Sequence, residues 1–110
     1  SQKDLALIEH VFDTTYTQVD DVIMSPIVRA AFNYKGELLV TALVHNFTHH
    51  SVRFANRSVF IRCEDYTEEQ EFTIPALSIP PFTSMPWTFI FKPDPLHAAL
   101  DLQKFVLEIE

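Results

Sequence analysis

A chain of 110 residues has the length of one domain, and apolar residues make up 47% of it, enough for one hydrophobic core. The net charge of −7, with 8 scattered Lys and Arg, excludes the basic stripe of a nucleic-acid binder and disfavours binding to anionic membranes. Gly36 is the only glycine, which excludes glycine-rich phosphate loops and dinucleotide fingerprints.

The first apolar segment, residues 5–12, fits either a short helix or an edge strand. Leu5, Ile8 and Phe12 share one face at helical spacing, so periodicity leaves both readings open. Residues 13–21 are rich in Asp and Thr and predict a polar loop, and Ser25-Pro26 predicts a break. We therefore expect an N-terminal extension or edge segment over residues 1–26 and a β domain over residues 27–110.

A β-hairpin around Gly36 is the clearest predicted element. Residues 27–33 and 38–45 both alternate in the manner of strands, and the turn at 34–37 places Gly36 where a positive φ is needed. One face of the second strand carries an apolar row that we expect to be buried: Leu38, Val40, Ala42 and Val44.

Short strands separated by prolines follow. The candidates are residues 52–54, 59–63, 68–74, 87–91 and 105–109, with a polar loop at 46–51, an acidic turn at 64–67 and one or two helical turns at 96–102. Proline lacks the N–H that a central ladder needs, so four prolines are expected to mark strand ends and edges: Pro75, Pro80, Pro81 and Pro86. Six to seven strands, with turn signals about every 8–12 residues, predict an all-β antiparallel sandwich of immunoglobulin-like topology.

The aromatic stretch that follows the prolines has two interpretations. Trp87, Phe89 and Phe91 alternate in the strongest strand and are expected to form the sandwich core. Alternatively, an aromatic side chain of this stretch anchors a partner, and Phe82 is better placed for that role than Trp87.

Catalysis has two weak candidate centres. His45, His49 and His50 would supply three imidazoles to zinc or copper, although a strand for His45 and an exposed turn for His49 and His50 explain them better. Cys63 would serve as a thiol nucleophile, but it follows an apolar run and is expected to be a buried small side chain. With one glycine, a Gly-x-Ser-x-Gly elbow is impossible, so we predict no enzyme, no catalytic residues and no cofactor.

The single cysteine and the absence of long apolar runs also bear on location. One cysteine forms no internal disulfide, no segment reaches the ~18 apolar residues of a membrane span, and the first residues do not resemble a signal peptide. These observations predict a cytoplasmic protein.

Residues 79–91, Ile-Pro-Pro-Phe-Thr-Ser-Met-Pro-Trp-Thr-Phe-Ile-Phe, resemble the signature of the SLAP domain, found in S-layer assembly proteins of bacilli and their relatives. Upstream, residues 39–46 resemble the family's Val-Thr-Ala strand, and residues 52–54 resemble its Pro-Ile-Lys-Phe step. Met85 and His45 stand where the family has Arg, and the loop before the diproline is shortened to residues 75–78. The resemblance covers about residues 27–96, whereas residues 1–26 match little.

The resemblance implies a non-enzymatic protein-binding domain beside the accessory Sec export route, associated with the membrane through the export machinery. The implied partners are the export ATPase, an S-layer protein or another SLAP-domain chain, including a second copy in a homodimer. The signature residues carried over as interaction or structural residues are Pro80, Pro81, Phe82, Pro86, Trp87, Phe89 and Phe91. Two alternatives stay open: a metal or thiol enzyme at the residues named above, and an envelope- or carbohydrate-binding sandwich, which would need exposed aromatic side chains.

Overall fold

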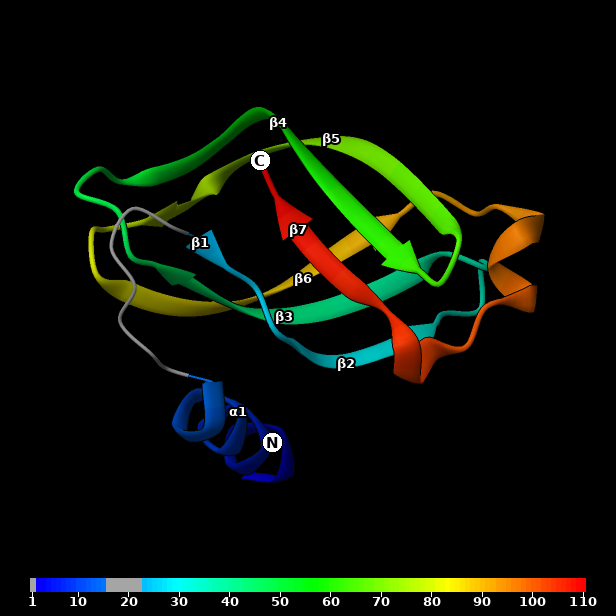
Figure 1. Ribbon diagram of the computed structural model, residues 1–110, viewed down its shortest axis with the longest axis horizontal. Helices are drawn as coiled ribbons and strands as arrows, with labels where there is room; N and C mark the ends of the chain where they lie inside the picture. Colours follow the sequence, from blue (N-terminus) through cyan, green and yellow to red (C-terminus); the bar gives the residue numbers. More distant parts are fainter. Residues whose placement is uncertain (1, 16–22) are drawn as a thin grey trace.

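In the computed structural model, which describes residues 2–15 and 23–110 (only the backbone at 13–15), seven strands form two antiparallel sheets that face each other (Figure 1). The predicted all-β antiparallel sandwich is confirmed. The one α-helix in this part of the chain lies outside the sandwich, and none of the described helices is long and apolar enough to span a membrane.

The first sheet, called sheet A, is built around β3 (Leu38–Asn46). Its neighbours on one side are β1 (Ile23–Met24) and β2 (Ile27–Phe32), and on the other side β6 (Thr83–Phe91). The hairpin of β2 and β3 is confirmed, with Phe32 opposite Leu38 and Gly36 at a φ of 78°. The Asn33 side chain closes this turn by accepting hydrogen bonds from the backbone nitrogens of Lys35 and Glu37 at 2.9 and 3.0 Å.

The second sheet, called sheet B, has the order β5-β4-β7, with bounds Val52–Cys63 for β4, Tyr66–Ile79 for β5 and Val106–Ile109 for β7. The predicted strands at 52–54 and 59–63 are one strand, because β4 continues through residues 55–58 with shifts of register at a bulge. Asn56 takes a φ of 51° there, a conformation that Asn tolerates better than most residues. The acidic turn is also shorter than predicted, since β5 already begins at Tyr66.

The prolines lie at sheet edges, as predicted, but two of them are inside strands rather than at strand ends. Pro75 lies in the edge strand β5 where the register shifts. Pro86 lies in the edge strand β6, which pairs with β3 along one edge only. On its other, free edge, the Gln70 side chain donates to the carbonyl oxygen of Ile90 and accepts from the N–H of Lys92. The backbone N–H and C=O groups of successive residues point to opposite edges of a strand. Pro86 is an even number of residues from Ile90 and Lys92, so the N–H that it lacks would have pointed to the free edge of β6 and not toward β3.

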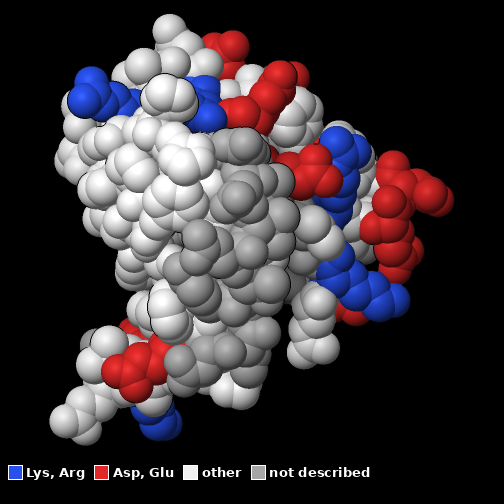
Figure 2. All heavy atoms as spheres, turned by 60° about the vertical axis from the view of Figure 1, so that its left-hand side comes forward, with Lys and Arg blue, Asp and Glu red and all other residues white. Residues whose placement is uncertain are grey.

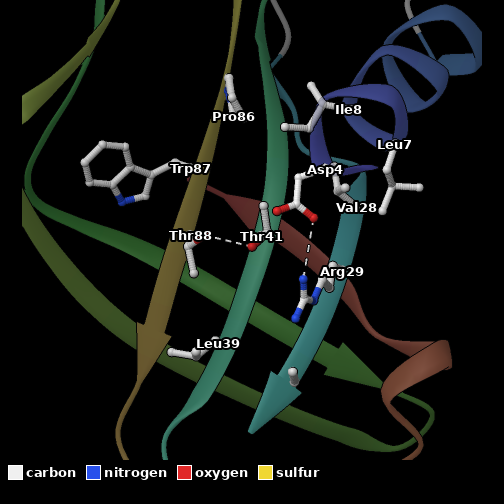
Figure 3. Close-up of a pocket in the computed structure, with 11 residues that line it drawn as sticks. Asp4, Leu7, Ile8, Val28, Arg29, Leu39, Thr41, Pro86, Trp87 and Thr88 are labelled. Carbon is white, nitrogen blue, oxygen red and sulfur yellow. Dashed lines mark hydrogen bonds and ion pairs between the residues drawn. The ribbon is translucent and has the colours of Figure 1, made fainter. Parts of the chain in front are cut away.

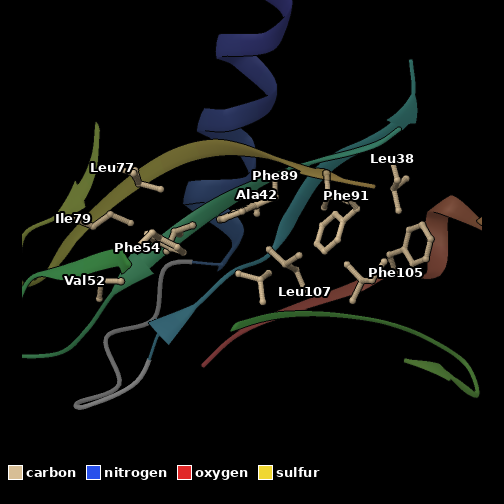
Figure 4. Close-up of a cluster of buried hydrophobic side chains, with 14 of the residues drawn as sticks. Leu38, Ala42, Val52, Phe54, Leu77, Ile79, Phe89, Phe91, Phe105 and Leu107 are labelled. Carbon is tan, nitrogen blue, oxygen red and sulfur yellow. The ribbon is translucent and has the colours of Figure 1, made fainter. Parts of the chain in front are cut away.

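The core lies between the two sheets and confirms the predicted inward row of β3. Phe89 and Phe91 are fully buried, while Trp87 is half-buried and packs against the core at its margin. Figure 4 shows side chains from both sheets meeting in this layer, with Phe105 and Leu107 entering from the C-terminal segment.

The helix α1 (Gln2–Thr15) resolves the open reading of residues 5–12 in favour of a helix. The loop predicted over 13–21 is helical at 13–15, and its remainder lies outside the described residues. The predicted helical turns near 96–102 are the two short 3-10 helices η1 (Pro95–Ala99) and η2 (Leu102–Lys104). Asp94 and Asp101 begin them, because their side chains accept hydrogen bonds from the N–H groups of the first turns.

Candidate interaction surface

The diproline segment and the loop after β3 are joined by one buried amide. The side-chain nitrogen of Asn46 donates to the carbonyl oxygens of Ile79 and Pro80 at 2.9 and 3.1 Å. The same nitrogen donates to the His50 carbonyl oxygen at 2.8 Å, and its amide oxygen accepts from the Thr48 backbone N–H at 2.9 Å. Because Asn46 is fully buried, these bonds hold the two loops against each other.

Phe82 follows the diproline in a conformation that is unusual for an aromatic residue. Its φ is 53°, in the left-handed region that favours glycine and asparagine. The ring is half-buried and meets the edge of the His49 ring, with centroids 5.0 Å apart. Residues held in such conformations cost on the order of 1–3 kcal/mol and cluster at binding sites.

The three histidines proposed as metal ligands have different surroundings. His45 is fully buried, its Nδ1 lies 2.6 Å from the Ser84 hydroxyl, and its ring stacks on Phe47. Burial lowers the pKa of His45 below its ordinary value. His49 and His50 are exposed, and in the described part of the chain the three imidazoles form no convergent group of ligand atoms.

A different group does converge among the described residues: Glu68, Asp94 and His97, with one ligand atom of each within 4.8 Å of the others. The buried His97 ring places Nε2 3.0 Å from Glu68 Oε1, which also accepts from the Tyr66 hydroxyl at 2.6 Å. Burial, followed by the hydrogen bond to Glu68, raises the pKa of Tyr66. Metal-ligating histidines almost always donate their second ring N–H to a partner, and Nδ1 of His97 has none among the described residues. Sequence reasoning missed this network, because Glu68 is far in sequence from Asp94 and His97, which lie together at η1.

Cys63 is buried, as predicted, with Sγ 3.7 Å from the carbonyl oxygen of Asp101. It lies at the end of β4 among core side chains, the position of a small apolar residue.

The outer face of sheet A carries α1 and a groove beside it. Figure 3 shows Ile8 of the helix pointing toward β3, Leu7 lying on the β2 side, and the Trp87 ring extending on the side of β6 away from α1. The groove has a volume of about 570 Å³. Its floor includes Thr41 and Thr88, whose hydroxyl oxygens are 2.7 Å apart.

A second groove of about 600 Å³ continues along the other side of the helix toward Phe82. Its walls include Ile8, Glu9, Phe12, Leu43, Phe82 and Pro86, so both grooves share Ile8 and Pro86. Phe82 and Pro86 of the signature are therefore brought to one surface by the fold, whereas the Trp87 ring extends on the other side of β6 and Phe89 and Phe91 are buried. No pattern in the sequence indicated that the N-terminal segment would form part of this surface.

The segments of β3, β5 and β6 that contribute to this surface are uncharged, whereas α1 and β2 add Asp4, Glu9 and Arg29 at the grooves. Residues 38–52 and 72–91 contain no Lys, Arg, Asp or Glu, in a chain whose net charge is −7. Figure 2 looks toward the end of the sandwich that bears the 47–51 and 79–83 loops. Its charged side chains gather at the top, the right and the lower left, and the broad white area on the left carries none. Depletion of charge together with aromatic side chains is the composition that marks the centre of protein interfaces.

The comparisons with known proteins agree with the signature. The SLAP domain matches residues 13–110, which leaves out most of α1 and includes all seven strands. No curated protein and no solved structure gives a significant match. On this match, which extends over nearly the whole chain, the protein belongs to the SLAP domain family.

Proposed function

We propose that this chain is a non-enzymatic protein-binding domain of accessory Sec export. Its partner is the export ATPase, an S-layer protein or another SLAP-domain chain, a second copy included, and its site of action is the cytoplasm beside the export machinery. Family membership supports this class of function. Residues 27–110 would form the binding domain, with residues 1–26 as an extension.

The conformation of Phe82 carries the proposal. Asparagine or glycine would take a φ of 53° at lower cost, yet the chain places a half-buried aromatic ring there. The ring stands in a wall of the second groove, and the sandwich segments beside it, residues 38–52 and 72–91, are uncharged. A side chain kept at a cost to folding is expected to contribute to binding.

Replacing Phe82 separates binding from folding. The Phe82→Asn variant removes the ring and relaxes the backbone, so we expect a melting temperature equal to or above that of the wild type. Loss of an aromatic anchor typically weakens binding by about tenfold or more. The measurement is affinity capture with the purified chain as bait in lysate of the source cells, quantified by mass spectrometry for the export ATPase and S-layer proteins.

The matched control is Leu96→Asn, which removes an apolar side chain that is 60% exposed on η1 and lines neither groove. Capture that falls with Phe82→Asn and not with Leu96→Asn supports the proposal. Equal capture by all three proteins, or no enrichment of export and S-layer components by the wild type, contradicts it.

A further inference from the structure

The two hydroxyl groups that line the second groove already have partners. The Thr83 hydroxyl donates to the carbonyl oxygen of Pro81 at 3.1 Å, and the Ser84 hydroxyl lies 2.6 Å from Nδ1 of His45. Apart from Glu9, the other described residues that line this groove are apolar. Its volume of about 600 Å³ is in the range of sites that bury a whole small-molecule ligand. An occupant therefore gains mainly from the burial of apolar side chains.

Glu9 determines the charge of this groove. It is the only charged residue among the described residues that line the groove. Its side chain is exposed and has no ion pair or side-chain hydrogen bond within the described part of the chain. In the first groove, the opposite charges of Asp4 and Arg29 pair at 3.7 Å and cancel. The Glu9 carboxylate therefore leaves the two grooves negative, which is also the sign of the chain's net charge of −7.

The helix α1 supplies a part of the groove that lies outside the family domain. Glu9 and the apolar wall residues Ile8 and Phe12 belong to α1 and precede residue 13, where the family match begins. The wall residues Leu43 and Phe82 lie inside the match. The groove thus joins an aromatic side chain of the domain to a carboxylate on the N-terminal helix.

We propose that the second groove selects a segment of the partner in which a bulky apolar side chain stands beside a Lys or Arg. This inference rests on the function proposed above, because it names the feature of the partner that the surface around Phe82 recognises. The apolar side chain packs between Phe82 and Phe12, and the cation pairs with Glu9. The negative net charge favours the approach of a basic segment and opposes the approach of a second copy of this chain.

Selection from a random peptide display library on the purified chain tests this preference. We expect the enriched peptides to combine a large apolar residue with a neighbouring Lys or Arg, and a synthetic copy of the most enriched peptide serves as the probe. In titration calorimetry, Glu9→Lys should bind this probe about fivefold or more weakly than the wild type does, because attraction at the groove becomes repulsion. The difference should shrink when NaCl is raised from about 0.05 M to about 0.5 M, because salt screens exposed charges.

The matched control is Glu69→Lys, which makes the same change of charge at an exposed position of β5 that lines neither groove. The proposed function fails separately, when the wild type captures neither export nor S-layer components. Weaker binding of the probe by Glu9→Lys and by Phe82→Asn, but not by Glu69→Lys, supports the preference for a basic apolar segment. Enriched peptides without a basic residue, no enrichment at all, or equal binding of the probe by Glu9→Lys and Glu69→Lys overturns it.

Discussion

Single residues decide the geometry of the interaction surface. Asn46 uses its buried amide to join two loops that are about thirty residues apart in sequence, which fixes the position of the diproline. Removing this amide would take a donor from the carbonyl groups of Ile79 and Pro80, and leaving a buried carbonyl unpaired is the costly form of a lost hydrogen bond. The Val-Thr-Ala strand and the diproline resembled the family separately, and Asn46 is the physical link between them.

His45 couples folding to pH. Burial lowers its pKa in the folded state, so the unfolded chain takes up a proton first as the pH falls below the ordinary value of 6.5. Its contribution to stability is therefore complete above that pH and is lost as the pH falls toward the lowered folded-state pKa. We expect the free energy of unfolding, measured by urea denaturation, to fall more between pH 7.5 and 5.5 in the wild type than in His45→Gln.

The exposed His50 provides the control for this measurement, because its replacement by Gln should leave the pH dependence unchanged. If the free energy of unfolding depends on pH in the same way in the wild type and in His45→Gln, protonation of the buried imidazole does not contribute to the pH dependence of folding.

At the scale of elements, the nine residues of β6 contribute to the core, to the groove and to the free edge of sheet A. Its inward side chains enter the core, its outward side chains form the groove, and Pro86 faces the free edge without loss of a ladder bond. Period-two alternation allows this division, because neighbouring residues of a strand belong to different surfaces.

The two aromatic residues of β6 should differ in their effect on stability. Phe89 is fully buried and contacts the rings of Phe54 and Phe72, so Phe89→Ala should cost about 3–5 kcal/mol. Trp87 is half-buried, and Trp87→Ala should cost less, about 1.5–3 kcal/mol. Denaturant titration of both variants checks the order. A larger loss for Trp87→Ala would place the centre of the core closer to the groove than the burial of these residues indicates.

At the scale of the whole molecule, side chains fasten the two sheets along both sides of the sandwich. On one side, Ser25 donates from its hydroxyl to the carbonyl oxygen of Leu107 in β7 at 2.7 Å. On the other, the Gln70 side chain of β5 bonds the backbone of β6 at Ile90 and Lys92, at 3.2 and 3.1 Å. An edge strand protected in this way is less available for pairing with another chain.

Removing the Gln70 clamp should therefore have two effects. Gln70→Ala loses two hydrogen bonds at an exposed edge, which should lower the free energy of unfolding by about 1–2 kcal/mol in urea titration. It also frees the backbone of β6, so light scattering should detect more self-association.

Glu71→Ala is the control for Gln70→Ala, because Glu71 is the next residue of β5, is exposed and points to the opposite face. If the two variants have the same free energy of unfolding and the same molar mass in light scattering, the Gln70 clamp contributes nothing to stability or to protection of the edge.

The sequence by itself determined the strands, the sandwich and the family. Alternating apolar residues and turn residues are local signals, and the burial of Leu38, Val40, Ala42 and Val44 follows from them directly. The Pro-Trp-x-Phe-x-Phe block is also contiguous, so the resemblance to the SLAP domain needed no coordinates. Such local signals could not predict the register shifts of β4 or the continuity of its two halves as one strand, because both depend on the neighbouring strands.

Only the tertiary structure decided which distant side chains meet. The bonding of Glu68 to His97, the clamp of Gln70 on β6 and the place of α1 over β3 all join residues that are 20 or more positions apart. The energy of such contacts depends on the packing of two sheets, which a one-dimensional pattern does not contain. For the same reason, the sequence left a helix and an edge strand equally open for residues 5–12, and only the packing against sheet A decided for the helix.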